Sequence, residues 1–305
     1  MQGDNKFMRK DILLPGLAVG GGAVGFILRR WQWASAYDAE SQLFRSGAVS
    51  TLVLLGVLVL LSALLLVLSA GGAKPNEFLP AFFCPSPMYM AGMAASGFLF
   101  FGAGLLGLLS GAELLSLSRS APELVPVSYP LTHLLCALLC FPAGLSNLAL
   151  GKACYRQELS SIACVCSSFP PLAGTIWLFI SHRDHSTDPV LMGYGITLLA
   201  IALLTVAHYE IAACLFGRRH LWRATFCLLA GALFALVSLA DSPDRFSAVL
   251  TAAFILSAMV QCHALLRSRF GPPYPRRLAS SRMPSGAEDK EEADTSTDTD
   301  FDEGV

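Results

Sequence analysis

Charged residues are scarce in this sequence and are absent from long parts of it. Only 14% of the 305 residues are charged, against about 25% in an ordinary soluble domain, while 54% are hydrophobic. Eight apolar runs contain neither Lys nor Arg. A soluble fold of this length cannot bury so many apolar side chains, because its buried volume is limited by its surface. The composition therefore excludes an ordinary soluble protein and predicts one whose partner is the lipid bilayer.

Motifs of catalysis and cofactor binding are also missing. The sequence contains no GK[ST] phosphate-binding loop, no HExxH zinc motif and no CxxC pair. We therefore expect a protein that is not an enzyme and that has no catalytic residues, no cofactor and no metal. No basic surface of the size that nucleic acid requires is present, so nucleic acid is not an expected partner. Most of the nine cysteines lie inside apolar runs, which indicates packing and not a disulfide framework.

The apolar runs are long enough to cross a bilayer, which takes about 20 mostly apolar residues in a helix. We predict an all-α fold, a polytopic transmembrane helix bundle of about eight spans over residues 1–270. The first run lacks a signal-peptide cleavage site and is interpreted as a retained helix, although its full crossing stays open. The eight runs cover residues 12–28, 48–70, 88–112, 131–150, 162–180, 190–216, 224–240 and 246–266.

The basic residues of the loops predict the orientation. With eight spans, 15 of the 21 Lys and Arg residues fall on the side of the two termini and six on the other side. Cytoplasmic loops carry the excess of positive charge in membrane proteins. We therefore predict a multi-pass protein of the plasma membrane with both termini in the cytoplasm. The loop at 29–47, with its three arginines, is an exception to this rule.

The stretch at 271–305 differs from the rest of the chain. Arginines and prolines come first, and nine of the 22 acidic residues follow position 287. A segment of this composition cannot bury enough apolar area to offset its ordering entropy, so we predict a disordered cytoplasmic tail. Its basic half suits anionic headgroups. A solubilising tail and a tail that docks a protein partner both fit this composition.

Proline occurs in the middle of two predicted spans. Pro142 lies in the fourth run, and the pair Pro170 and Pro171 lies in the fifth. Proline removes a helix hydrogen bond and clashes with the preceding turn, so these are candidate helix breaks. Broken helices often flank the substrate sites of transporters. A structural kink and part of a transport pathway both remain open.

Five polar residues are predicted at similar depth on the cytoplasmic side of the membrane. Glu210 is the one acidic residue inside a run, and a charge in hydrocarbon costs at least about 2.5 kcal/mol. We therefore expect Glu210 to face the interior and to be paired, with Asn147 or His263 as its donor. Together with His208 and Gln261 they form a candidate intramembrane polar cluster. Such a cluster suits either a lock between helices or a proton- or ion-coupled site.

The segment after the first run combines arginine with aromatic residues. Arg29, Arg30, Trp31 and Trp33 follow the run directly. Tryptophan concentrates at membrane interfaces, and arginine suits lipid phosphate. We therefore predict that these four residues are interface or lipid anchors.

A family resemblance rests on the same region. The Gly-rich first run, followed by LRRWQ at 28–32 and AYD at 36–38, resembles a family of uncharacterised bacterial multi-pass membrane proteins. The resemblance covers about the first 50 residues, and it implies a membrane fold but no activity.

Two functional hypotheses follow from the sequence. One is a non-enzymatic bundle that serves as a membrane partner or sensor, with the tail as its contact. The other is a small-solute or ion permease that uses the proline-containing spans and Glu210. A permease is expected to have a water-filled cavity that reaches Glu210, whereas a partner or sensor is expected to hold Glu210 in a closed, paired environment.

Overall fold

The computed structural model describes residues 9–38, 40–41, 43–71, 79–123, 126–185, 190–217 and 221–271. The predicted tail lies outside the described residues from position 272 onward. Besides the helices, the described chain has two 3-10 turns, η1 (Leu79–Phe82) and η2 (Leu239–Asp241), and one antiparallel pair of strands, β1 (Tyr37–Asp38) and β2 (Leu43–Phe44). The helices are α1 (Lys10–Ala36), α2 (Val49–Ser69), α3 (Pro87–Ser120), α4 (Ser128–Arg156), α5 (Ser161–Cys166), α6 (Phe169–Asp184), α7 (Leu191–Leu215), α8 (Leu221–Ser238) and α9 (Arg245–Phe270).

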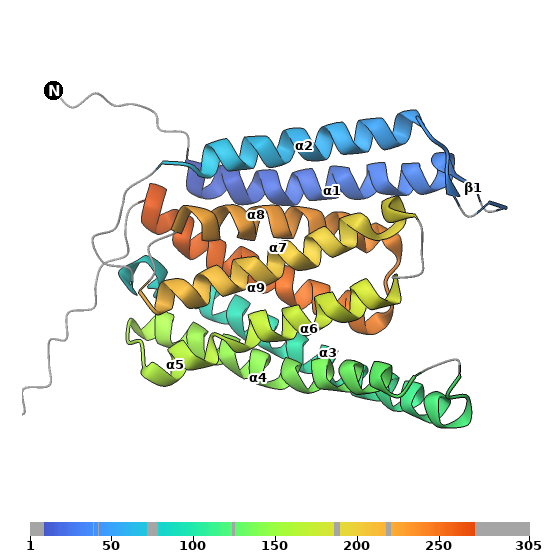
Figure 1. The fold of residues 1–305 in the computed structure, drawn as a ribbon. Helices are drawn as coiled ribbons and strands as arrows, with labels where there is room; N and C mark the ends of the chain where they lie inside the picture. Colours follow the sequence, from blue (N-terminus) through green and yellow to red (C-terminus); the bar gives the residue numbers. More distant parts are fainter. Residues whose placement is uncertain are drawn as a thin grey trace, which may run out of the picture. The chain divides into compact units, whose positions relative to one another are not determined.

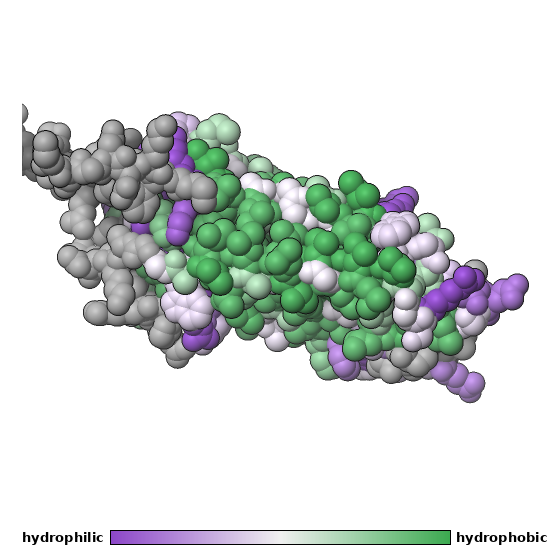
Figure 2. Space-filling model, turned by 90° about the horizontal axis from the view of Figure 1, so that it is seen from above, coloured by the Kyte–Doolittle hydropathy of each residue, from purple (hydrophilic) through white to green (hydrophobic). Residues whose placement is uncertain are grey.

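Eight segments of the described chain are long and apolar enough to cross a membrane. α5 and α6 together form one of these spans, and α8 with η2 forms another. Helices satisfy their own backbone hydrogen bonds, as hydrocarbon requires. Figure 2 shows, on one face, a broad apolar surface with hydrophilic residues toward its two ends. The chain is an integral, multi-pass α-helical membrane protein, as the sequence predicts.

The first span is longer than the sequence predicts. α1 continues through the two arginines at 29–30 to Ala36, so the first part of the predicted loop 29–47 is helical. Its 27 residues extend about 40 Å, which exceeds the roughly 30 Å of a hydrocarbon core. α1 is therefore long enough to cross the membrane completely.

The helices pack around α9, which contacts α3, α8, α1 and α7. α1 and α2 lie along one edge of the bundle and α3 and α4 along the opposite edge (Figure 1). α1 begins and α9 ends at the same end of the bundle, where the Lys10 Nζ atom lies 5.3 Å from the centre of the Phe270 ring. The connections α1–α2, α3–α4, α6–α7 and α8–α9 therefore meet at the other end.

Glycine allows α3 and α4 to approach each other at backbone distance. A Cβ atom added to Gly97 would lie 2.9 Å from the Gly144 carbonyl oxygen, and one added to Gly144 would lie 2.8 Å from the Gly97 carbonyl oxygen. Close backbone contact of this kind holds helices together in lipid, where the hydrophobic effect does not drive their association. Gly16 in α1, in contrast, has no neighbour within 4 Å of an added Cβ atom.

We expect Gly144→Ala to destabilise the bundle and Gly16→Ala to leave it unchanged or slightly more stable. The methyl group added at position 144 would overlap the Gly97 carbonyl oxygen. This oxygen cannot move without shifting α3, so the expected cost is about 1–3 kcal/mol. The second substitution only improves helix propensity, by about 1 kcal/mol. Thermal unfolding of the purified protein in one detergent measures both effects. Equal melting temperatures for the two variants would contradict the close contact between α3 and α4.

Candidate functional site

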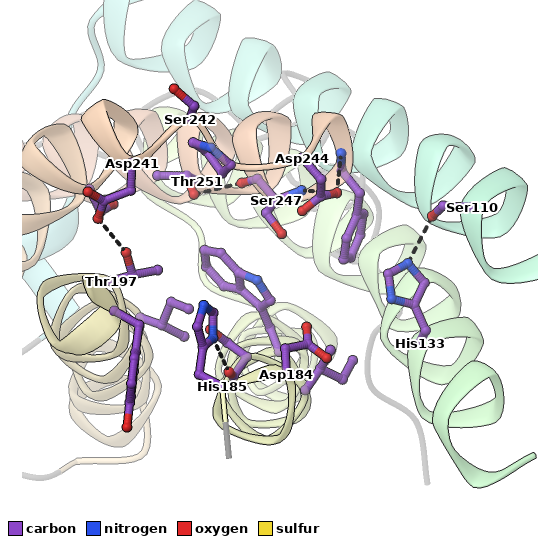
Figure 3. A pocket seen from close by; sticks show the side chains of 18 of the residues that line it. Ser110, His133, Asp184, His185, Thr197, Asp241, Ser242, Asp244, Ser247 and Thr251 are labelled. Carbon is purple, nitrogen blue, oxygen red and sulfur yellow. Dashed lines mark hydrogen bonds between the residues drawn. The ribbon is translucent and has the colours of Figure 1, made fainter. Parts of the chain in front are cut away.

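A cavity of about 770 Å³ opens at the end of the bundle where the helix connections meet (Figure 3). Its wall is formed by several segments that lie at this end: the ends of α3 and α6, the beginnings of α4, α7 and α9, the last turns of α1 and the turn η2. These segments come from almost the whole length of the chain. The lining contains two histidines and no Lys or Arg among the described residues, and its four carboxylates are Glu113, Asp184, Asp241 and Asp244.

Three of these carboxylates are exposed to solvent at the mouth of the cavity. Asp244 is the N-cap of α9, and its side chain accepts hydrogen bonds from the backbone N–H groups of Phe246 (3.0 Å) and Ser247 (3.2 Å). Aspartate suits this position because a helix begins with unpaired N–H groups. Asp184 ends α6 and lies near enough to Asp244 for their charges to interact. The mouth is therefore electronegative.

The back wall is built on a buried arginine. Arg29 is completely buried, and its Nε donates to the Asp241 carboxylate over 2.7 Å. Its two terminal nitrogens donate to the Gln32 side chain (2.7 Å) and to the carbonyl oxygens of Met192 (3.0 Å) and Gly193 (2.8 Å). The guanidinium group thus joins α1 to η2 and to the first residues of α7.

The same arrangement occupies both carboxylate oxygens of Asp241 with hydrogen bonds. Besides Arg29, it accepts a hydrogen bond from the Trp33 indole N–H (2.8 Å) and from the Thr197 hydroxyl (3.0 Å). Its charge is compensated and its oxygens are occupied. This carboxylate therefore shapes the wall, whereas the charges at the mouth have no partner of this kind.

The prediction that Arg29 binds lipid is wrong, because α1 continues past it and turns its side chain inward. Trp33 also differs from the prediction, since its indole N–H points to Asp241. Arg30 and Trp31 are exposed on the outside of the same helix. They stay predicted interface anchors.

His133 lies at the inner side of the cavity, buried to 93%. Its Nε2 atom lies 2.9 Å from the Ser110 hydroxyl oxygen, and its ring packs against Phe246. With the Ser110 proton assigned to the Leu106 carbonyl oxygen (3.1 Å), the tautomer that fits is the one in which the imidazole Nε2 donates to the Ser110 oxygen. Nδ1 then carries the lone pair, and this buried atom has no hydrogen-bond partner in the described chain.

An aromatic floor closes the inner end of the cavity. Trp177 lines the cavity and stacks on Phe254, with ring centres 5.7 Å apart and an interplanar angle of 15°. Phe254 is completely buried and meets the edges of Phe100 and His208 on its other sides. These rings separate the cavity from the polar residues below.

Three residues of the predicted polar cluster meet beneath this floor, around Ser257. The Ser257 hydroxyl lies 3.0 Å from Nε2 of His208, accepts from the Gln261 amide (2.8 Å) and lies 3.4 Å from the Asn147 amide oxygen. The Asn147 amide nitrogen donates to Ser96 (2.8 Å), which joins α3 to the network. All five residues are buried. The network locks α3, α4, α7 and α9 together.

Glu210 and His263 do not belong to this network. Glu210 is buried and paired as expected, but its partner is Arg223 of α8, at 2.9 Å, and not Asn147 or His263. His208 is two residues from Glu210 and so lies on a different side of α7. The cavity of 770 Å³ does not reach Glu210, and neither does a second, apolar cavity of about 660 Å³ between α2, α7 and α8.

The candidate helix breaks behave differently from one another. Pro142 is not a break, because α4 continues through it from Ser128 to Arg156. Pro170 and Pro171 occupy the first turn of α6, directly after the break that follows α5. Proline is tolerated there because the first N–H groups of a helix have no partner inside it. In Figure 1 this break lies toward the end that carries the termini, away from the cavity.

Sequence reasoning missed most of the cavity. The sequence does not single out His133 as a candidate, and the carboxylates lie at the ends of runs where charge is ordinary. Their common position beside helix ends on one side of the bundle was the available signal.

No family model, no curated protein and no solved structure matches this chain. The resemblance carried by the first 50 residues stays a prediction. The geometry of the cavity is therefore the basis for the proposed function of this chain.

Arg29→Met should destabilise the protein strongly, because it leaves Asp241 without its cation in a mostly buried site. Removing one partner of a buried ion pair costs about 3–5 kcal/mol. Arg30→Met is the matched control, since Arg30 is exposed and makes only long contacts, at 3.4–3.5 Å, with residues 240 and 242. Thermal melts of both variants in the same detergent test this difference. A melting temperature for Arg29→Met that equals that of Arg30→Met would contradict the role of Arg29.

Proposed function

We propose that this chain is a non-enzymatic membrane sensor that binds a small ligand in the cavity of 770 Å³. The observation that carries the proposal is a cavity open at one end of the bundle and closed below by the stacked rings of Trp177 and Phe254. A ligand enters and leaves such a site from the same side. This suits a receptor, whereas a transporter that works by alternating access must also adopt a second state in which the same site opens to the other side of the membrane.

The size and lining of the cavity support this proposal. Small-molecule sites occupy roughly 300–1,000 Å³ and combine aromatic walls with a few polar groups. The cavity falls in this range and combines Trp177, Tyr129 and Tyr194 with carboxylates and imidazoles.

The fold provides a direct connection from the cavity to the tail. α9 begins beside the cavity, where Asp244 caps it, and runs without interruption to Phe270, next to the tail. We assign the tail at 271–305 to contact with a protein partner, on the basis of its charge composition. From the distribution of basic residues we further propose that the protein lies in the plasma membrane with both termini in the cytoplasm. The cavity, at the opposite end of the bundle, then faces outward.

A permease is the second candidate function, and one observation favours it. The network around Ser257 lies directly beneath the aromatic floor and joins four helices. If Trp177 and Phe254 separated, polar groups would continue from the cavity toward the cytoplasmic side. Glu210 is not on this route, because it is held by Arg223.

Site-directed labelling distinguishes the two functions. We expect Ser247→Cys, in the cavity wall, to react with a membrane-impermeant thiol reagent added from outside only. Ser257→Cys, beneath the floor, should react from neither side, because a closed floor excludes the reagent. The unsubstituted chain, with its nine native cysteines, is the background control. Labelling of Ser257→Cys from the cytoplasmic side would overturn the sensor in favour of the permease.

A further inference from the structure

We infer that the ligand of this cavity is a small organic cation with N–H donors, such as an amine, held by the carboxylates of the mouth and by His133. The inference rests on the proposed ligand-binding function and names the chemical class of its ligand. It follows from the charge of the lining, from one unsatisfied buried atom and from the spacing of the polar groups.

The lining is negatively charged. Arg29 compensates Asp241, which leaves Glu113, Asp184 and Asp244 without an ion pair to any described residue. Two arginines lie beside lining residues. Arg183 lies over the Tyr129 ring at 5.4 Å and bonds to a serine hydroxyl at 3.1 Å, and Arg30 lies 3.4 Å from the Ser242 hydroxyl. A cleft lined by one sign of charge attracts ligands of the opposite sign and raises their local concentration. An anionic ligand would be repelled at the mouth.

His133 provides an acceptor that the protein itself does not satisfy. Its Nε2 is engaged with Ser110, and its buried Nδ1 has no partner in the described chain. In Figure 3, this second nitrogen lies on the side of the ring toward Asp184. Buried polar atoms without a partner are rare in native proteins and call for an explanation. A donor on a ligand that enters from the mouth is the partner that this atom lacks.

Besides hydroxyl groups such as those of Tyr129 and Tyr194, which can both donate and accept, the lining contains further groups that only accept. His185 donates its Nδ1 proton to the Ser181 carbonyl oxygen over 2.8 Å, so its Nε2 atom accepts when the ring is neutral. Ionised carboxylates only accept. A ligand that satisfies Asp184, Asp244 and His133 must therefore supply several donors. An ammonium group provides both the donors and the charge.

The spacing of these groups excludes a compact metal ion as their common ligand. The described residues contain no group of three His, Cys, Asp or Glu side chains close enough to hold one ion. An organic cation can reach separate acceptors and fill the space between them. Trp177, Tyr129 and Tyr194 line the same cavity, and aromatic rings suit both a cation and its apolar part.

Three probes of similar size test the inference on the full-length protein in nanodiscs. They are phenethylammonium, the neutral 2-phenylethanol and the anionic 3-phenylpropionate, and their binding is followed by the fluorescence of tryptophan. We expect phenethylammonium to bind at least tenfold more tightly than the other two. Asp184→Asn and His133→Phe should each weaken its binding about tenfold, which is the loss of one charge-assisted hydrogen bond.

Two further variants serve as controls. Glu40→Gln removes the same charge at the same end of the bundle but outside the cavity, and it should leave the affinity unchanged within about twofold. Ser247→Trp fills the mouth and should abolish binding of every probe. A thermal melt of each variant confirms that it is folded. If His133→Phe does not fold, Asp184→Asn and Ser247→Trp still test the site.

Each remaining outcome has a defined meaning. Tighter binding of the neutral or the anionic probe, abolished by Ser247→Trp, overturns the cationic ligand while the sensor function stands. An equal loss of affinity in Glu40→Gln and Asp184→Asn means that surface charge attracts the cation, and it overturns the site. Absence of binding by all three probes also overturns the inference. The labelling of Ser257→Cys decides the sensor function separately from these results.

Discussion

The contact between Arg29 and Asp241 is the interaction on which the candidate site depends. A charge inside a membrane protein is tolerated only when it is fully paired, and Arg29 meets this condition with a carboxylate, an amide oxygen and two backbone carbonyls. The rigid guanidinium fork suits several acceptors at once better than a lysine would. Through these bonds α1, η2 and the beginning of α7 hold fixed positions, and they form one wall of the cavity.

The bundle is divided into two halves by its aromatic floor. Above Trp177 and Phe254, helix ends diverge around a polar cavity that solvent reaches. Below them, the buried hydrogen bonds around Ser257 join α3, α4, α7 and α9. A buried network with most of its groups satisfied rigidifies a core. One half of the protein thus contains the polar cavity, and the other half contains the buried hydrogen-bond network.

The sequence predicts the spans well because hydrocarbon imposes a length and excludes charge, and both are visible in a single chain. It does not predict where α1 ends, because an arginine after an apolar run suits a loop or a helix equally. The partner that decides the matter, Asp241, lies 212 positions later. The partner of Glu210 is missed for a similar reason, since Arg223 precedes the predicted seventh run but lies in the first turn of α8. The cavity is beyond reach because its lining comes from segments that meet only in the folded chain.

Ring contacts connect the candidate site with the closed half. Trp177 lines the cavity and stacks on Phe254, and Phe254 meets the His208 ring edge at 5.0 Å. His208 is in turn held by Ser257 of α9. A ligand shifts a conformational equilibrium only if it binds the two states with different affinities. A ligand that contacts Trp177 is sensitive to the position of this ring, and the ring cannot move without disturbing Phe254 and the network beneath it. In the proposed sensor, these contacts would couple occupancy of the cavity to the packing of α9 without any opening through the membrane.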